Sequence, residues 1–192
     1  MNKPVENIQA KFNDLRATLL DLYRSATADK ASNKPIYITG YDIIQQNEAS
    51  KQIDALESHL KQNGIIAFTV NVFDIAVGIM EQRGTLEQAI KMEPTMQKNH
   101  FLSALQTEFD IQGLFLPKLN ETIPEDADFV LITGLGEVYP FIRAHDVINA
   151  IDSQYSNKWI VFFYPGEYTG NSLNIFGIES DLSSNHYRAI KI

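Results

Sequence analysis

The sequence predicts an α/β protein with a layered, Rossmann-like fold, in which a mainly parallel sheet carries a helical insertion and has an antiparallel C-terminal end. Short apolar runs alternate with segments of helical periodicity from Pro35 onward, the pattern of a parallel sheet covered by helices. Two runs, residues 128–133 and 159–164, are apolar on both faces, as buried central strands are. Residues 73–110 have helical spacing and no strand-like run.

The first segment is predicted to be an amphipathic helix. Its apolar residues recur at spacings of four, three, four and three, which places them on one face of a helix. The stripe either packs on the chain's own domain or docks on another protein. The apolar residues of this stripe are Ile8, Phe12, Leu15, Leu19 and Leu22.

A polar stretch separates this helix from the rest of the chain. Residues 25–34 are small and polar and are followed by Pro35, which is typical of a linker. We therefore expect residues 1–34 to form an N-terminal amphipathic helix with its linker, and residues 35–192 to form the α/β domain.

The domain is predicted to begin with a strand, a helix and a second strand. A short β-rich run at residues 36–39 ends at Gly40. The following apolar residues have helical spacing, and Asn63 with Gly64 marks the end of that helix. Residues 65–72 are the next apolar run and are predicted to be a strand.

Three helices are predicted in the insertion. Asp74 is placed to cap the first, which ends near Gly84. Thr85 and Gln88 have the spacing of a capping box for the second. The third helix is indicated by Phe101, Leu102, Leu105 and Phe109.

The second half of the domain is predicted to start with a loop that contains Gly113, Pro117 and Pro124. The strand at residues 128–133 follows. A glycine-containing turn then leads into a helix over residues 138–151, with Pro140 in the first turn, where a missing N–H costs little.

The last strands follow this helix. Residues 159–164 are a buried strand that stops at a Pro-Gly turn. Residues 173–176 and 187–192 are two short candidate strands around a polar turn, and we expect them to form the antiparallel end of the sheet.

Composition excludes several classes of protein. The chain has 192 residues, 44% of them hydrophobic, and no cysteine. Disulfides, thiolate nucleophiles and cysteine-ligated metals are therefore excluded. The longest apolar run, residues 159–164, is too short to span a membrane, and the N-terminus lacks the features of a secretory signal. We expect a cytoplasmic protein.

The charge is acidic and unevenly distributed. The formal net charge is -8, which argues against direct nucleic-acid binding. Residues 1–34 hold six bases and four acids, a formal +2. The remaining ten bases and twenty acids give residues 35–192 a formal charge of -10.

Ligands of open α/β sheets bind beyond the carboxyl ends of the strands, where three loops of this chain are expected. These loops are residues 40–42, 134–137 and 165–168. No G-x-x-x-x-G-K-[ST] sequence is present, so a P-loop is excluded.

The second loop combines a glycine pair with a polar helix start. Gly134 and Gly136 match the start of a dinucleotide fingerprint or, alternatively, make a tight turn, because the third glycine position is Tyr139. Tyr139 and Arg143 are four residues apart and are expected on one helical face. This composition suits a protein-contact hot spot as well as an anion pocket. The candidate residues here are Gly134, Gly136, Glu137, Tyr139, Arg143 and His145.

Tyr164, Glu167 and Tyr168 surround the Pro-Gly turn of the third loop, so at least one of these side chains should emerge at the top of the sheet. Glu167 is a candidate general base. Alternatively it is a structural carboxylate that accepts hydrogen bonds from backbone N–H groups or from an arginine such as Arg143 or Arg188.

No catalytic set or metal site can be assembled from the sequence, and we expect no cofactor. The four histidines have none of the spacings of a zinc site. The chain also lacks a G-x-S-x-G nucleophile elbow.

The C-terminal third resembles the BrxB family of BREX phage-defence systems, a family also catalogued as a domain of unknown function. The resemblance is carried by ITGLGEVYPFIRAHD at 132–146, IVFFYPGEYTG at 160–170, Ser172-Leu173, Phe176-Gly177 and the ending YRAIKI at 187–192. Thr169 and Asn171 depart from the family pattern, where an acidic residue and a glutamine are expected.

The resemblance implies a small accessory subunit of a defence complex that methylates host DNA and blocks phage replication. Its implied partners are the PglZ phosphatase-like subunit and other BREX components. The family has no established catalytic residues to carry over, so the matching positions are candidate contact or structural residues.

Two functions follow as hypotheses. The first is a non-enzymatic interaction subunit. The alternative is an atypical nucleotide- or phosphate-binding enzyme without a P-loop, in which residues 134–137 and the following helix N-terminus hold phosphate and Glu167 acts as base.

Overall fold

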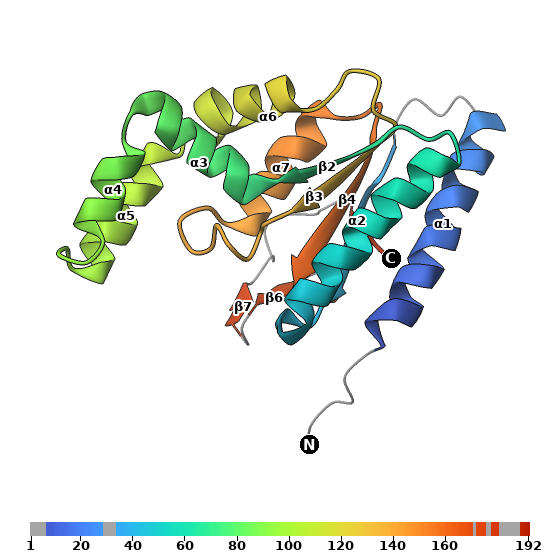
Figure 1. Ribbon diagram of the computed structural model, residues 1–192, viewed down its shortest axis with the longest axis horizontal. Helices are drawn as coiled ribbons and strands as arrows, with labels where there is room; N and C mark the ends of the chain where they lie inside the picture. The colour runs from blue at the N-terminus through green and yellow to red at the C-terminus, as the bar shows by residue number, and fades with distance from the viewer. Residues whose placement is uncertain (1–6, 29–33, 171, 176–177, 181–188) are drawn as a thin grey trace.

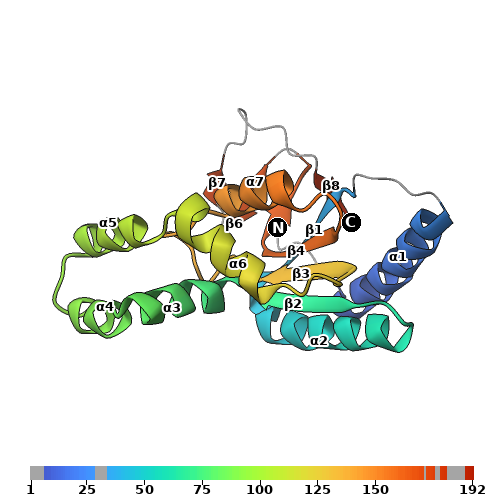
Figure 2. The ribbon, with the colours of Figure 1, turned by 90° about the horizontal axis from the view of Figure 1, so that it is seen from above.

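The computed structural model describes residues 7–28, 34–170, 172–175, 178–180 and 189–192. A five-stranded sheet lies between two layers of helices, and a pair of helices projects from one end of the molecule (Figures 1 and 2). The predicted α/β class is confirmed. No helix in the described part of the chain has the length and hydropathy needed to cross a membrane.

The main sheet is parallel throughout. Its strand order is β2-β3-β4-β1-β8, and every neighbouring pair runs in the same direction. Hydrophobic residues are paired on neighbouring central strands. Ile38 of β1, for example, lies opposite Phe162 of β4. The strands are β1 (Ile36–Tyr41), β2 (Ala67–Asn71), β3 (Phe129–Thr133), β4 (Trp159–Pro165) and β8 (Ala189–Lys191).

One face of the sheet is covered by α1 (Ile8–Ala28) and α2 (Gln46–Gln62), with the short 3-10 helix η1 (Ile43–Gln45) between β1 and α2. Phe12 of α1 stacks on Phe163 of β4 with the ring centroids 5.7 Å apart. The apolar stripe of the first helix therefore packs on the chain's own sheet, which confirms the first of the two alternatives. Its buried members are Ile8, Phe12, Leu15 and Leu19.

The opposite face is covered by α7 (Ala144–Gln154), together with α3 (Val72–Arg83) and α6 (Leu116–Thr122). Figure 2 shows α1 and α2 on one side of the sheet and α7 on the other. Alternate residues of one strand enter the two cores: Val130 packs with the α7 layer, and Leu131 packs with α1 and α2.

The helical insertion is confirmed, and its two outer helices, α4 (Leu86–Met92) and α5 (Lys98–Glu108), form the arm that projects beyond the sheet (Figures 1 and 2). Gly84 ends α3 in the left-handed conformation with φ of 71°, as predicted for a helix terminus.

The predicted helix caps in this region were wrong. Asn71, at the end of β2, caps α3 by accepting a hydrogen bond from the Phe73 N–H at 2.8 Å, so that the helix begins before Asp74. The Thr85 side chain makes no cap to α4; its hydroxyl donates to the Met80 carbonyl at 3.4 Å instead.

The predicted loop before β3 contains helical structure. The Asp110 carboxylate accepts hydrogen bonds from the N–H groups of Gln112 and Gly113, both at 3.0 Å, and starts the π-helical turn η2 (Ile111–Phe115). Pro117 lies in the first turn of α6, where a proline needs no hydrogen-bond partner.

The helix predicted over 138–151 begins later, at Ala144. Residues 135–141 are turns and bends, and Pro140 follows a cis peptide bond. Val138 and Ile142 are nevertheless buried. Their apparent helical spacing reflects a loop that packs into the core.

The C-terminal strands differ in part from the prediction. A small antiparallel sheet is present, built from β5 (Glu167–Tyr168), β6 (Leu173–Ile175) and β7 (Ile178–Ser180). The last strand, β8, joins the main sheet parallel to β1, so it does not pair with β6 as expected.

Buried Lys158 fixes the loop before β3 to the start of β4. Its ammonium donates to the carbonyl oxygens of Pro124 at 3.2 Å, Glu125 at 2.6 Å and Ala127 at 3.0 Å. Each of the three N–H groups of the Lys158 ammonium therefore has an acceptor. A charged group can be buried at an acceptable cost only when its hydrogen bonds are satisfied in this way.

We expect Lys158→Met to lower the free energy of unfolding by about 2 kcal/mol, because three carbonyl acceptors lose a charged donor in a buried site. Chemical denaturation measures the change. Lys51→Met is the matched control: its side chain is 74% exposed and pairs with Glu48 at 3.8 Å, so its effect should stay within about 0.5 kcal/mol. Equal effects of the two substitutions would contradict the role given to Lys158.

Candidate functional site

A polar cleft of 290 Å³ lies beyond the carboxyl ends of β2 and β3. This is the region where ligands of parallel α/β sheets bind. Residues from the N-terminal half of α2, from the first turn of α3 and from the loop after β3 close its sides. Its lining includes Gln46, Asp54, Thr69, Asn71, Asp74 and Glu137.

Glu137 links three segments that are far apart in the sequence. Its carboxylate accepts hydrogen bonds from the side-chain amides of Gln46 and Asn71, both at 3.3 Å. Two of the predicted site residues, Gly134 and Glu137, are therefore brought to this cleft. The carboxylate is anchored by neutral amides and faces solvent, since Glu137 is exposed.

The loop after β3 requires glycine at its first position. Gly134 has φ of 82°, and a Cβ atom there would lie 1.9 Å from the Asn71 Oδ1. That oxygen is the cap of α3. The tight-turn interpretation of the glycine pair therefore has a physical basis in the close packing of this loop on the end of β2.

The charge of the cleft is negative. Asp54, Asp74 and Glu137 line it, and its lining contains no lysine, arginine or histidine. Three carboxylates repel a phosphate group. The helix N-terminus invoked for phosphate binding is also displaced, because α7 begins only at Ala144. Among the described residues, no three or more histidine, aspartate or glutamate side chains are placed so that together they could hold a metal ion.

The space between the ends of β1 and β4 is filled by the protein itself. A Cβ atom at Gly40 would lie 2.3 Å from the backbone oxygen of Gly166. Tyr164 and Tyr168 are buried here, and the Tyr168 hydroxyl lies 2.9 Å from the Gly170 carbonyl oxygen and 3.1 Å from that of Ala189.

Of the three polar residues predicted in the loop after β4, only Glu167 is exposed. Burial, with a further contribution from Tyr139, raises the pKa of the Tyr164 hydroxyl. The two tyrosines of this loop thus serve as core residues. Arg188, one of the two arginines suggested as a partner of Glu167, lies outside the described residues.

The remaining predicted residues are spread along the segment before and into α7. Gly136 lies in the turn after β3, and Tyr139 is partly buried against the core. Arg143 is exposed immediately before α7, so the expectation that Tyr139 and Arg143 share a helical face was wrong. His145 Nε2 lies 2.9 Å from the Asp146 carboxylate.

The sequence interpretation missed the part of the cleft that comes from α2 and β2. Asp54, Thr69 and Asn71 belong to elements interpreted only as a helix and a strand. One signal was available: Asn71 is a polar residue at the end of an apolar strand, a position that points to a cap or a site in a parallel sheet.

The pKa of Tyr41 depends in part on the charge of this cleft. Its hydroxyl donates to the Gln46 Oε1 at 2.5 Å. Burial raises the pKa of the Tyr41 phenol to about 12, and the negative charge of Glu137 contributes to the increase.

We therefore expect Glu137→Gln to lower the pKa of Tyr41, because the phenolate no longer faces a carboxylate. Ultraviolet titration of tyrosinate measures this, with Tyr41→Phe identifying the signal. Tyr155, whose pKa is also raised to about 12 by burial, is the internal reference, and Glu125→Gln is the control substitution. An unchanged Tyr41 titration in Glu137→Gln would show that the two groups are not coupled.

Comparison with known proteins identifies the family. The family model described as "BREX protein BrxB" matches residues 68–192. A relative named "BREX protein BrxB" from Bacillus cereus (strain H3081.97) is 27% identical over 160 residues, covering 81% of this chain and 82% of the relative. A second, with the same name, from Escherichia coli O9:H4 (strain HS) is 25% identical over 158 residues, covering 81% and 76%.

No solved structure matches the chain. The family match spans more than half of the sequence and includes the arm, β3, β4 and the loops that follow these strands. The chain therefore belongs to the BrxB family of BREX proteins.

Proposed function

We propose that the chain is a non-enzymatic accessory subunit of a BREX-type bacteriophage defence complex and that it binds the PglZ phosphatase-like subunit. Membership of the BrxB family supports a role in phage defence. The observation that carries the interaction role is the arm formed by α4 and α5, which projects from the body within the segment matched by the family model.

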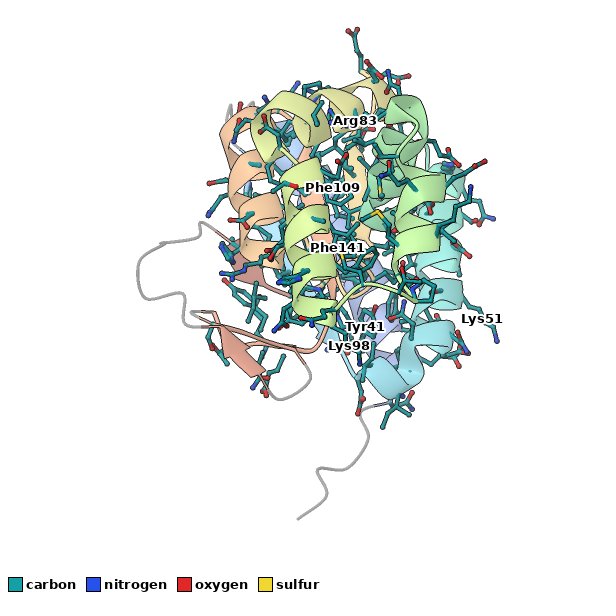
Figure 3. The ribbon with its side chains drawn as sticks, turned by 90° about the vertical axis from the view of Figure 1, so that its left-hand side faces the viewer. Tyr41, Lys51, Arg83, Lys98, Phe109 and Phe141 are labelled. Carbon is teal, nitrogen blue, oxygen red and sulfur yellow. The ribbon has the colours of Figure 1, made fainter. Side chains whose placement is uncertain are left out.

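The base of the arm is firmly attached. Arg83 Nε lies 3.2 Å from the Glu108 carboxylate and joins the end of α3 to the end of α5. Phe109 stacks on Phe141 with the ring centroids 5.4 Å apart (Figure 3). These contacts fix the direction in which the arm leaves the body.

The outer part of the arm contributes little to the core. Neither α4 nor α5 has a fully buried residue. Ile90, in the middle of α4, is 60% exposed. Helices this short are marginal without tertiary packing, and the Ile90 side chain is available for an apolar contact with a partner. A partner seated on the arm would supply the missing burial.

The alternative of a phosphate-binding enzyme has less support. The cleft beside the Gly134–Glu137 loop is lined by carboxylates, and the space beyond β1 and β4 is occupied by packed backbone. Both features oppose binding of a polyanionic nucleotide.

Co-purification with the PglZ-type subunit of the same BREX system tests the proposal. We expect the two proteins to elute together and Ile90→Glu to reduce the retained partner at least tenfold, because a charge replaces an apolar contact. Circular dichroism checks that the variant keeps its helices.

Ile66→Glu is the matched control, since Ile66 is 42% exposed and lies before the start of β2, at the opposite end of the strands from the arm. The Ile66→Glu variant should retain as much of the PglZ-type subunit as the unmodified chain does. Failure of the unmodified chain to co-elute would refute the proposal. Equal binding by Ile90→Glu and Ile66→Glu would refute the assignment of the contact to the arm.

A further inference from the structure

A groove of 710 Å³ lies on the outer surface of the molecule, where α1 and α2 run side by side (Figure 1). It is on a different surface from the arm and belongs to the α1–α2 layer, whereas the arm extends from α3 in the layer on the other face of the sheet. The lining residues that matter here are Arg16, Ala17 and Leu20 of α1 and Ala55 and His59 of α2.

The floor of the groove suits a helix. Ala17 and Ala55, one from each helix, are exposed, and their short side chains allow another backbone to approach closely. Leu20 is partly buried between the two helices and offers apolar surface. Helices pack by inserting side-chain ridges into grooves of this kind.

The charge in the groove is positive and lacks a direct counter-charge. Arg16 donates from Nη1 to the Asn13 side-chain oxygen at 2.8 Å and from Nη2 to the Gln52 side-chain oxygen at 2.9 Å. Its Nε is buried and has no hydrogen-bond partner. Among the described residues, no carboxylate forms an ion pair with Arg16; the Glu48 carboxylate is reached only through the Gln52 amide, at 3.1 Å.

A carboxylate would satisfy this guanidinium better than the two amide oxygens do. Hydrogen bonds from arginine to a carboxylate are about twice as strong as those to neutral oxygens, and the Arg16 side chain is partly exposed and lines the groove. His59 adds a second basic side chain to the lining, which contains no acidic residue. On a protein with a net charge of -8, this groove is a local site of opposite charge.

We infer that the α1–α2 groove binds a helix of a protein partner and that an aspartate or glutamate of this helix pairs with Arg16. The inference rests on the proposed role as an interaction subunit, and it adds a second contact surface and the chemistry of its occupant. A phosphodiester also pairs with arginine, but one arginine and one histidine do not provide the clustered charge that nucleic-acid binding requires.

The test uses the full chain together with all protein subunits of its BREX system. Arg16→Glu reverses the charge in the groove, and Ala17→Trp fills it. Arg24→Glu is the matched control on the same helix, because the Arg24 side chain is 68% exposed, lies 3.9 Å from the Asp21 carboxylate and does not line the groove. Thermal melts confirm that the variants are folded.

We expect Arg16→Glu and Ala17→Trp each to reduce the retained partner at least tenfold and Arg24→Glu to have less than a twofold effect. A photo-crosslinker at Ser58, which also lines the groove, should attach to an acidic helical segment of another subunit.

Three outcomes would overturn the inference. If the chain assembles and the groove variants bind as well as Arg24→Glu, the groove is not a contact surface, while the proposed function stands. If the crosslinker attaches to nucleic acid, the groove does not bind a protein helix as inferred. If the unmodified chain associates with no subunit, the proposed function and this inference both fail.

Discussion

The burial of β3 and β4 on both faces is the constraint on which the rest of the structure depends. All seven residues of β4 are buried, and so are the first four of β3. Alternate side chains of each strand point to opposite faces, so two separate cores must be covered. Neither face can be left to solvent, because each carries large apolar side chains such as Phe162 on one side and Phe163 on the other.

Each core is covered by its own helices, and these helices form the surfaces that we propose to bind partners. The core that contains Phe163 is completed by α1, which stacks Phe12 on it; the groove between α1 and α2 is the outer surface of that layer. The core that contains Phe162 is covered by α3, α6 and α7. Because α3 continues directly from β2, it leads the chain away from the sheet and into the arm. The acidic cleft lies where β2 and β3 end between the two layers.

The sequence was sufficient to predict the elements whose patterns arise from burial in regular structure. The strands around Phe129 and Trp159 and the apolar stripe of α1 belong to this class. The errors arose where packing overrides local signals. Val138 has the spacing of a helix but lies in a buried loop, and Pro117, interpreted as a loop residue, lies in the first turn of α6.

The candidate site was predictable only in part, because long-range topology builds it. Gln46 and Glu137 are 91 residues apart and meet across the cleft. The hydrogen bond between them depends on the crossover from β1 to β2, which places the first turn of α2 beside the loop after β3. The sequence identifies Gly134 and Glu137 as residues after a strand, but it does not identify their neighbours. The family resemblance came from local motifs at 132–146 and 160–170 and did not require this topology.

Hydrogen–deuterium exchange of the chain, alone and with the PglZ-type subunit, tests the central claim most directly. The claim is that the chain acts by holding a partner on the projecting arm. We expect the backbone amides of α4 and α5 to exchange fast in the free chain and to become protected in the complex, while those of β3 and β4 stay protected in both. A complex in which α4 and α5 exchange as in the free chain would contradict the claim, as would the absence of a complex.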